Sequence, residues 1–248
     1  MLLERKNAVV YGAAGSMGGA VARAFAAEGA NVFLAGRTLA TLDAVAKEIT
    51  AAGGVAETAR VDAHDEQAVE SHADAVARQA GSIDISFNAV GMAAVQGTPL
   101  IDMSLEDFMT PVTEAARTQF ITATAAARRM SAQGSGVILL LSSSAARESR
   151  FEMGGFNLAC AAIEAFTRSL AGEVGKQNVR VVCLRPNFTP ETAPELSESD
   201  LEPVVEATLL GRLPLLAEVA GAAVFAASDR AGAMTGAVVN LTCGAIVD

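Results

Sequence analysis

The sequence predicts an α/β protein with a doubly wound, seven-stranded parallel sheet that carries helices on both faces. Short apolar runs alternate along the chain with longer segments of helical periodicity. Most of the apolar runs are continuous rather than alternating with polar residues, which indicates strands buried on both faces. Right-handed helical crossovers between such strands cover each face in turn, and this defines the doubly wound architecture.

The elements follow one another in β-α order from the start of the chain. The expected strands are Asn7–Tyr11, Asn31–Ala35, Ala56–Val61, Ile83–Phe87, Gly136–Leu141, Val179–Leu184 and Ala237–Leu241. The expected helices are Met17–Glu28, Leu39–Ala52, Asp65–Ala80, Val112–Ala132, Phe156–Gly175 and Ala217–Ser228. Because no Ser/Gly-rich linker, shift in charge or repeat divides the chain, residues 1–248 are expected to form a single domain.

One segment, Asn187–Pro203, fits neither a helix nor a strand, because prolines are mixed with acidic residues there. The prolines are Pro190, Pro194 and Pro203, and the acidic residues, one of them just beyond the segment, are Glu191, Glu195, Glu198, Asp200, Glu202 and Glu206. We interpret residues 187–210 as a mobile lid over a substrate site. The alternative is an acidic surface loop without a role.

The composition excludes several classes of function. The chain is 51% hydrophobic and 19% charged, which suits one substantial core and excludes a disordered or fibrous protein. Its net charge of −10 would repel a nucleic-acid backbone. Residues Met1–Lys6 are too charged and too few for a signal peptide, and the apolar runs are too short to span a membrane, so a soluble cytoplasmic protein is expected.

The cysteines and histidines predict neither disulfides nor a metal site. Three cysteines are an odd number and are widely spaced, and two histidines are too few for a ligand cluster. These residues are Cys160, Cys183, Cys243, His64 and His72.

A glycine-rich turn follows the first strand and leads directly into a helix. Such a turn offers free backbone N–H groups and the positive end of a helix dipole to an anion, and missing Cβ atoms let phosphates approach. Glycines can also serve close packing of helix on strand, so the turn is informative mainly because of its position. The candidate cofactor-binding residues here are Gly12, Ala14, Gly15, Ser16, Met17 and Gly18.

The end of the second strand favours NADP over NAD. A dinucleotide-binding fold meets the adenosine ribose at this point, and an acidic residue would bind the 2′-hydroxyl of NAD. The sequence has Arg37 and Thr38 instead, whose donors suit a 2′-phosphate. The alternative is a solvated arginine at the start of a helix. Two further pairs follow the third and fourth strands, namely Asp62 with Ala63 and Asn88 with Ala89.

Together these segments resemble the classical subfamily of the short-chain dehydrogenase/reductase family over essentially the whole chain, which implies a Rossmann-type fold. The TGxxxGxG turn of that family corresponds to Tyr11–Gly18, its adenine-contacting aspartate to Asp62, and its NNAG segment to Phe87–Val90. Further similarities are Gly211-Arg212, Glu218-Val219-Ala220, Ala227-Ser228-Asp229 and Thr235-Gly236. The resemblance also implies cofactor contacts by Pro186 and Thr189. The departures are Tyr11 for threonine, Ser16 for glycine, and Asn187 for the glycine after Pro186.

The resemblance implies a catalytic asparagine, serine, tyrosine and lysine, of which this chain keeps one. Alignment on the strand Gly136–Leu141 places the serine at Ser143. Thirteen residues further on, the tyrosine position is Phe156, and the lysine position is Cys160. The asparagine position is Ala115. The lysine in this family lowers the pKa of the tyrosine, so without both groups conventional ketone reduction is expected to be very slow.

A shifted register cannot restore the missing groups. The single tyrosine is Tyr11, and the lysines are Lys6, Lys47 and Lys176, none of which is suitably placed. A replacement proton donor could come from a carboxylate (Glu148 or Glu152) or an arginine in the loop Ala145–Met153, or from Cys160 beside a cation. A structural or solvent-facing role is the alternative for each.

The segments Ala115–Ala132 and Phe156–Gly175 are rich in alanine, which permits close helix packing. The resemblance implies a homodimer or homotetramer through these helices, and packing against the sheet is the alternative. Three functional hypotheses remain open: an NADP(H)-dependent oxidoreductase acting on a carbonyl or alcohol substrate with a replaced proton donor, a catalytically silent subunit beside an active paralogue, and an NADP(H)-binding regulatory protein.

Overall fold

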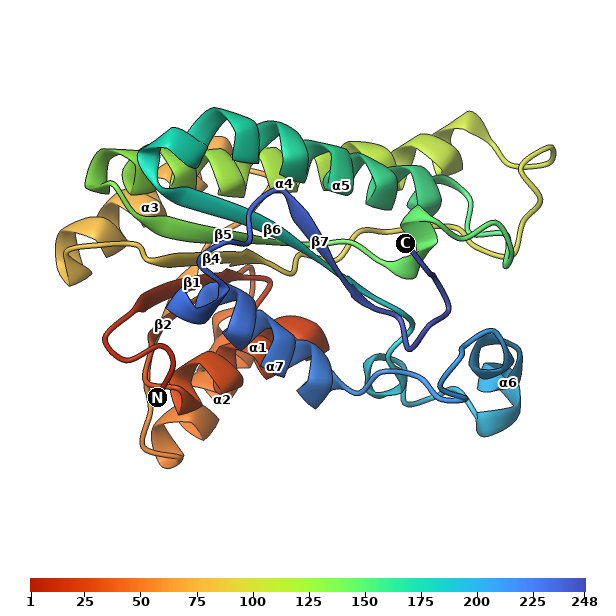
Figure 1. Cartoon of the computed structure of the whole chain (residues 1–248), viewed down its shortest axis with the longest axis horizontal. Coiled ribbons are helices and arrows are strands. Elements are labelled where there is room, and N and C mark those ends of the chain that lie inside the picture. The colour runs from red at the N-terminus through yellow and green to blue at the C-terminus, as the bar shows by residue number, and fades with distance from the viewer.

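A computed structural model, which describes residues 1–248, confirms the seven-stranded parallel sheet and its Rossmann-like topology (Figure 1). The strand order is β3-β2-β1-β4-β5-β6-β7, and every neighbouring pair is parallel. The strands are β1 (Asn7–Tyr11), β2 (Asn31–Gly36), β3 (Val55–Arg60), β4 (Ile85–Asn88), β5 (Gly136–Leu141), β6 (Val179–Pro186) and β7 (Ala237–Leu241).

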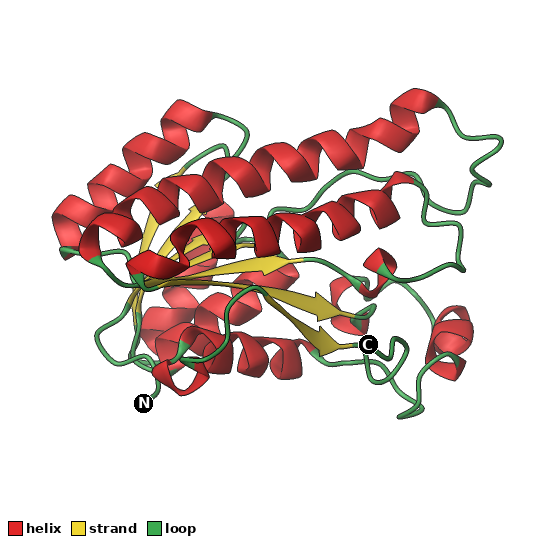
Figure 2. Ribbon diagram, turned by 45° about the horizontal axis from the view of Figure 1, so that its top comes forward, coloured by secondary structure: helices red, strands yellow, loops and turns green.

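Helices cover both faces of the sheet (Figures 1 and 2). One layer contains α1 (Ser16–Ala27), α2 (Leu39–Ala51) and α7 (Leu216–Ala227). The other contains α3 (Glu66–Ala80), α4 (Leu105–Gln133) and α5 (Gly155–Val174). None of these helices is long and apolar enough to cross a membrane.

The pleat of the strands divides the core into two hydrophobic clusters. In β1, Val9 and Tyr11 pack under the α3–α5 layer, whereas Ala8 and Val10 pack under the α1, α2 and α7 layer. Both faces of the central strands are therefore buried, as the continuous apolar runs predicted. The edge strands β3 and β7 are only partly buried, because each has a neighbour on one side only.

The helix α4 begins earlier than predicted. It starts at Leu105 rather than Val112 and contains Pro111 in its interior. Ser104 caps the helix by accepting a hydrogen bond from the N–H of Asp107 (3.0 Å), and Pro111 is buried. This cap and the burial outweigh the backbone hydrogen bond that the proline removes.

The segment Asn187–Pro203, which the sequence pattern assigns to neither helix nor strand, contains helical residues. The segment holds a short 3-10 helix, η3 (Pro190–Thr192), and the start of α6 (Glu198–Glu206). A capping box begins α6: the side chain of Ser197 accepts from the N–H of Asp200, whose carboxylate accepts from the N–H of Ser197. No residue of α6 is fully buried, and the helix lies away from the two layers (Figure 1).

Candidate functional site

The sequence-predicted site residues gather where the parallel strands end. The carboxyl ends of β1 and β4 lie side by side, and the strand order reverses direction between them. Helices leave opposite faces of the sheet at such a switch point, so a crevice opens there.

The glycines of the first turn have two different roles. Gly12 has a left-handed backbone (φ +74°), and a Cβ there would lie 2.6 Å from the carbonyl oxygen of Ala89. A Cβ at Gly18 would collide with the carbonyl oxygen of Gly12. Close packing therefore requires both glycines, as the structural alternative predicted.

Gly15, in contrast, faces open space before α1. It is exposed, and no side chain caps the helix and no acidic residue lies in its first turn. The backbone N–H groups of Ser16, Met17 and Gly18 have no hydrogen-bond acceptor in the chain. With the exposed Ala14 beside them, these N–H groups form a cradle that fits a phosphate.

The end of β2 presents a free cation next to a carboxylate. Arg37 and Thr38 are exposed at the start of α2, and Arg37 makes no ion pair. Asp62 follows β3, and Ala63 beside it is buried. The N–H of His64 donates to Asp62 (3.0 Å) and, with smaller contributions from the His64 ring and from Arg37, lowers the pKa of Asp62. These groups fit the adenosine end of a dinucleotide.

Asn88 supports the site from below. Its buried amide donates to the carbonyl oxygen of Thr118 (3.0 Å) and the hydroxyl of Thr122 (2.7 Å), and its oxygen accepts from the N–H of Val90 (2.9 Å). The hydrogen-bonding groups of the Asn88 side chain are therefore occupied by partners within the protein. Asn88 therefore fixes the turn that carries Ala89 over Gly12.

A cavity of about 580 Å³ lies beyond the ends of β5 and β6. Ten of its seventeen lining residues are hydrophobic, which suits a mainly apolar ligand. These are Ala145, Phe151, Met153, Phe156, Phe188, Leu196, Leu201, Val204, Ala207 and Ala245. Gly97 and six polar residues complete the lining: Gln96, Ser143, Ser144, Glu148, Asn187 and Asp200.

Two of the four aligned catalytic positions face this cavity. Ser143 precedes the 3-10 helix η1 (Ser144–Ala146), and its Oγ accepts a hydrogen bond from the N–H of Ala145 (3.3 Å). Its hydroxyl proton remains free to be donated to a ligand. Phe156, in the first turn of α5, places an aromatic ring without an ionisable group in the same cavity.

The other two aligned positions lie within the core. Cys160 is fully buried next to the backbone of Ser143, and burial, with the neighbouring Cys183 and Glu164, raises the pKa of its thiol to about 12. A replacement of lysine by such a thiol provides no cation. Ala115 is also buried and belongs to the cluster under α3–α5.

The groups considered as replacement proton donors are either ionised at neutral pH, as Glu148 is, or hold their protons too tightly to give them up, as Cys160 and the arginines of the loop do. Glu148 lines the cavity, but Arg150 donates to it (2.9 Å) and lowers its pKa. Tyr11 is buried in the core, with its ring 5.9 Å from that of His72, and burial raises its pKa.

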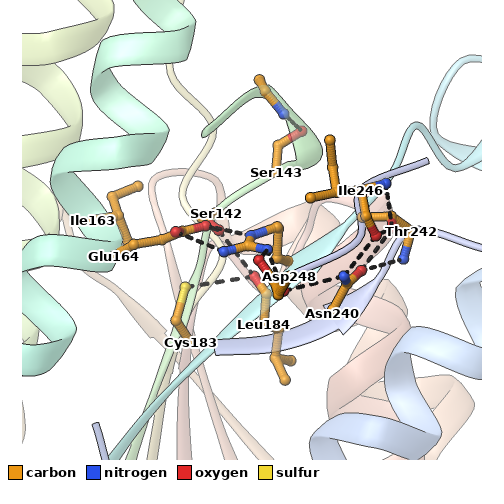
Figure 3. Close-up of polar contacts among 12 residues, drawn as sticks. Ser142, Ser143, Ile163, Glu164, Cys183, Leu184, Asn240, Thr242, Ile246 and Asp248 are labelled. Carbon is orange, nitrogen blue, oxygen red and sulfur yellow. Dashed lines mark hydrogen bonds and ion pairs between the residues drawn. The ribbon is translucent and has the colours of Figure 1, made fainter. Parts of the chain in front are cut away.

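A buried ion-pair network lies beside Ser142 and joins β6, α5 and Asp248 (Figure 3). Arg185, only 1% exposed, donates to both carboxylate oxygens of Glu164 in α5 (2.6 and 2.9 Å) and to Asp248 (2.7 and 2.8 Å). Ser142 donates to Glu164 (3.1 Å). The network therefore ties the last residue of the sequence to α5 and to the backbone beside Ser143.

The lid segment forms one wall of the cavity and contacts the end of β6. Thr189 is buried, and its hydroxyl donates to the carbonyl oxygen of Asn187 (3.2 Å). Pro186 is the last residue of β6 and is also buried. Leu201 and Val204 of α6 reach the cavity, so the residues predicted as a lid do border it.

The sequence did not reveal that Asn187 lines the cavity or that Arg185 pairs with Glu164. Asn187 was noted as a departure from the family pattern, but not as a cavity residue. A visible signal existed for the pair, because each is a charged residue within a mostly apolar strand or helix face.

Comparisons with known proteins agree with this arrangement. A family model described as enoyl-(acyl carrier protein) reductase matches residues 12–245. A 3α-hydroxysteroid dehydrogenase from Mediterraneibacter gnavus is 30% identical over 244 residues, covering 97% of each chain. A 3-oxoacyl-(acyl carrier protein) reductase from Chlamydia trachomatis is 28% identical over 245 residues, covering 98% of each chain.

Solved structures show the same fold. A short-chain type dehydrogenase/reductase from Mycobacterium marinum superposes with a TM-score of 0.88 at 29% identity, covering 99% of this chain and 97% of that one. The structure of gox2181 has a TM-score of 0.90 at 26% identity, covering 97% and 95%. The chain belongs to the short-chain dehydrogenase/reductase family of oxidoreductases, whose members generally bind NAD(P)(H).

Proposed function

We propose that this protein binds NADP(H) and a carbonyl or alcohol compound, but catalyses their conventional oxidoreduction only very slowly. The observation that carries the proposal is the pairing of an open dinucleotide crevice with a cavity that has Phe156 and a buried Cys160 at the proton-transfer positions. The scaffold for binding is retained, whereas the groups that would complete the reaction are replaced.

The residues present fit a dinucleotide. The free N–H groups at the start of α1 would hold the pyrophosphate, and Asp62 would contact the adenosine end. Arg37 favours NADP(H), because its exposed guanidinium offers paired donors to a 2′-phosphate and no acidic residue stands there for a ribose hydroxyl. A bound nicotinamide supplies a hydride donor or acceptor.

The side chains of the cavity can orient a carbonyl group but cannot protonate it efficiently. Ser143 offers a hydroxyl donor to a substrate oxygen, and the serine hydroxyl is a poor acid. General acid–base assistance contributes about 10²–10⁴-fold to a rate, or about 3–5 kcal/mol of barrier. Its loss is the physical reason for the slow turnover that we propose.

An NADPH titration tests the binding part of the proposal. The chain contains no tryptophan, so the fluorescence of NADPH can be followed with little interference. Saturable enhancement by the unmodified protein, with weaker binding of NADH, is the expected result. A complete lack of NADPH affinity would overturn the proposal.

A further inference from the structure

The side chain of Asn187, a residue that lines the cavity, has a donor without a partner in the chain. Only 7% of Asn187 is exposed, and its Nδ2 has no hydrogen-bond partner in the chain. Buried amide groups normally find partners, because an unpaired one costs about 1–3 kcal/mol. An unpaired donor that lines a cavity is therefore a candidate ligand-binding group.

The orientation of this amide is fixed by its oxygen. The backbone N–H of Phe188 donates to Oδ1 of Asn187 (2.8 Å), and the hydroxyl of Ser144 donates to the same atom (3.0 Å). A backbone N–H can only donate, so exchange of the amide oxygen and nitrogen would set two donors against each other. Nδ2 must remain the free atom.

The other residues of the cavity favour an apolar ligand without negative charge. Its lining is mainly hydrophobic, with Phe151, Phe156 and Phe188 contributing aromatic rings. The two acidic side chains there, Glu148 and Asp200, both have pKa values held below their ordinary range by hydrogen bonds from Arg150 and from Ser197, respectively. Both are ionised at neutral pH and disfavour an anionic ligand.

We propose that Asn187 Nδ2 and the Ser143 hydroxyl together bind the carbonyl oxygen of a neutral, largely apolar ketone in this cavity. The inference rests on the proposed function and names its substrate class. Ser143 is the serine shared with the family, whereas Asn187 replaces a family glycine. The asparagine therefore supplies a second donor to a site that lacks the tyrosine hydroxyl, and it acts as a binding and positioning group rather than as an acid.

The test measures ligand binding without turnover. The probe is the fluorescent neutral ketone 6-propionyl-2-dimethylaminonaphthalene, compared with its 6-propyl analogue, which has nearly the same shape and no carbonyl. The variant is Asn187→Asp, because a carboxylate keeps the acceptor for Phe188 and Ser144 and removes only the Nδ2 donors. Thermal unfolding of the variant verifies that it is folded.

The ratio of the two affinities removes the effects that both probes share, such as a change in the shape of the cavity, and leaves those specific to the carbonyl oxygen: the lost hydrogen bond and the repulsion by the new carboxylate. The unmodified protein is expected to prefer the ketone, and Asn187→Asp is expected to reduce that preference about three- to tenfold. A matched control is Asn178→Asp, since Asn178 is exposed and does not line the cavity.

An unchanged ketone preference in folded Asn187→Asp protein would overturn the inference. If the same variant also loses NADPH affinity, the donor is assigned to the nicotinamide carboxamide instead. Failure of NADPH binding by the unmodified protein would contradict the proposed function, whereas ketone preference is measured with and without NADPH and is judged separately.

Discussion

At the scale of single residues, the proposed preference for NADP(H) depends on Arg37. The Arg37→Ala substitution is expected to weaken NADPH binding about tenfold or more, because charge-assisted hydrogen bonds to a phosphate are lost, and to leave NADH binding nearly unchanged. Calorimetric titration of both nucleotides checks this. Arg78→Ala, an exposed arginine in the last turn of α3, serves as the control. An equal effect on both nucleotides would mean that Arg37 does not read the 2′-phosphate.

Asp248 is expected to make the stability of the fold depend on pH. A hydrogen bond from Arg185, with its charge, lowers the pKa of Asp248 in the folded state. Its contribution is therefore fully present above the unfolded pKa of about 3.9 and is lost as the pH falls through the folded value. Asp248 is partly exposed, so that contribution is at most about 1 kcal/mol.

Urea unfolding of Asp248→Asn and of the unmodified protein measures this dependence. At pH 7 the Asp248→Asn protein is expected to have a lower free energy of unfolding than the unmodified protein. This difference should shrink below about pH 4. Asp102→Asn, an exposed aspartate whose side chain makes no hydrogen bond, should show no such difference. A difference that is the same at pH 7 and pH 3 would contradict the assignment.

Residue identities predicted part of the site. The spacing from Ser143 to Phe156 placed both in one cavity, because strand end and helix start are set by the fold. The free amide of Asn187 could not be predicted, since it depends on which partners satisfy the amide oxygen. The pair of Arg185 and Glu164 is formed by residues 21 positions apart, and only the packing of α5 on β6 brings them together.

At the scale of elements, the uncapped start of α1 is the feature on which the proposed phosphate site depends. A Cβ at Gly15 would lie no closer than 3.4 Å to its nearest neighbour, and its φ of −77° suits any residue. The Gly15→Asp substitution is therefore expected to cap the helix, retaining or raising stability by a few tenths of a kcal/mol.

The same substitution is expected to abolish NADPH binding, because the carboxylate occupies the free N–H groups and repels the pyrophosphate. Thermal unfolding and NADPH fluorescence of one preparation measure both effects. Gly15→Ala separates the charge from the added Cβ and should retain most of the affinity. NADPH binding that survives Gly15→Asp unchanged would place the nucleotide elsewhere.

The sequence pattern predicted most of the helices but missed α6 and misplaced the start of α4. Helical periodicity predicted α1 to α5 and α7 because each buries one apolar face against the sheet. The helix α6 has no fully buried residue and therefore no such face, so its capping box at Ser197 and Asp200 was the only local signal. The predicted start of α4 was too late because Pro111 lies within the helix, and a proline usually ends a helix.

At the scale of the whole molecule, we propose that the outer faces of α4 and α5 associate two copies of the chain, in a homodimer or homotetramer. Phe120 is 51% exposed, and its ring lies 6.2 Å from that of Phe166 on the neighbouring helix. Phe120→Asp is expected to shift the mass seen by sedimentation equilibrium toward that of a monomer. Leu39→Asp, at an exposed site on α2, is the control.

A monomeric unmodified protein would contradict this assembly. Co-purification with an active relative from the native host would instead support the mixed oligomer, in which this chain is the silent subunit.

The strand order itself was predictable, because alternating β and α segments with short connections leave few doubly wound arrangements.

The most direct test of the account compares NADPH consumption, at a saturating neutral ketone, by the unmodified protein and by the triple variant Phe156→Tyr, Cys160→Lys and Ala115→Asn. The account predicts that the variant, once shown to be folded and to bind NADPH, is about a hundredfold or more faster. Rapid, saturable turnover by the unmodified protein, equal to or above that of the variant, would contradict it.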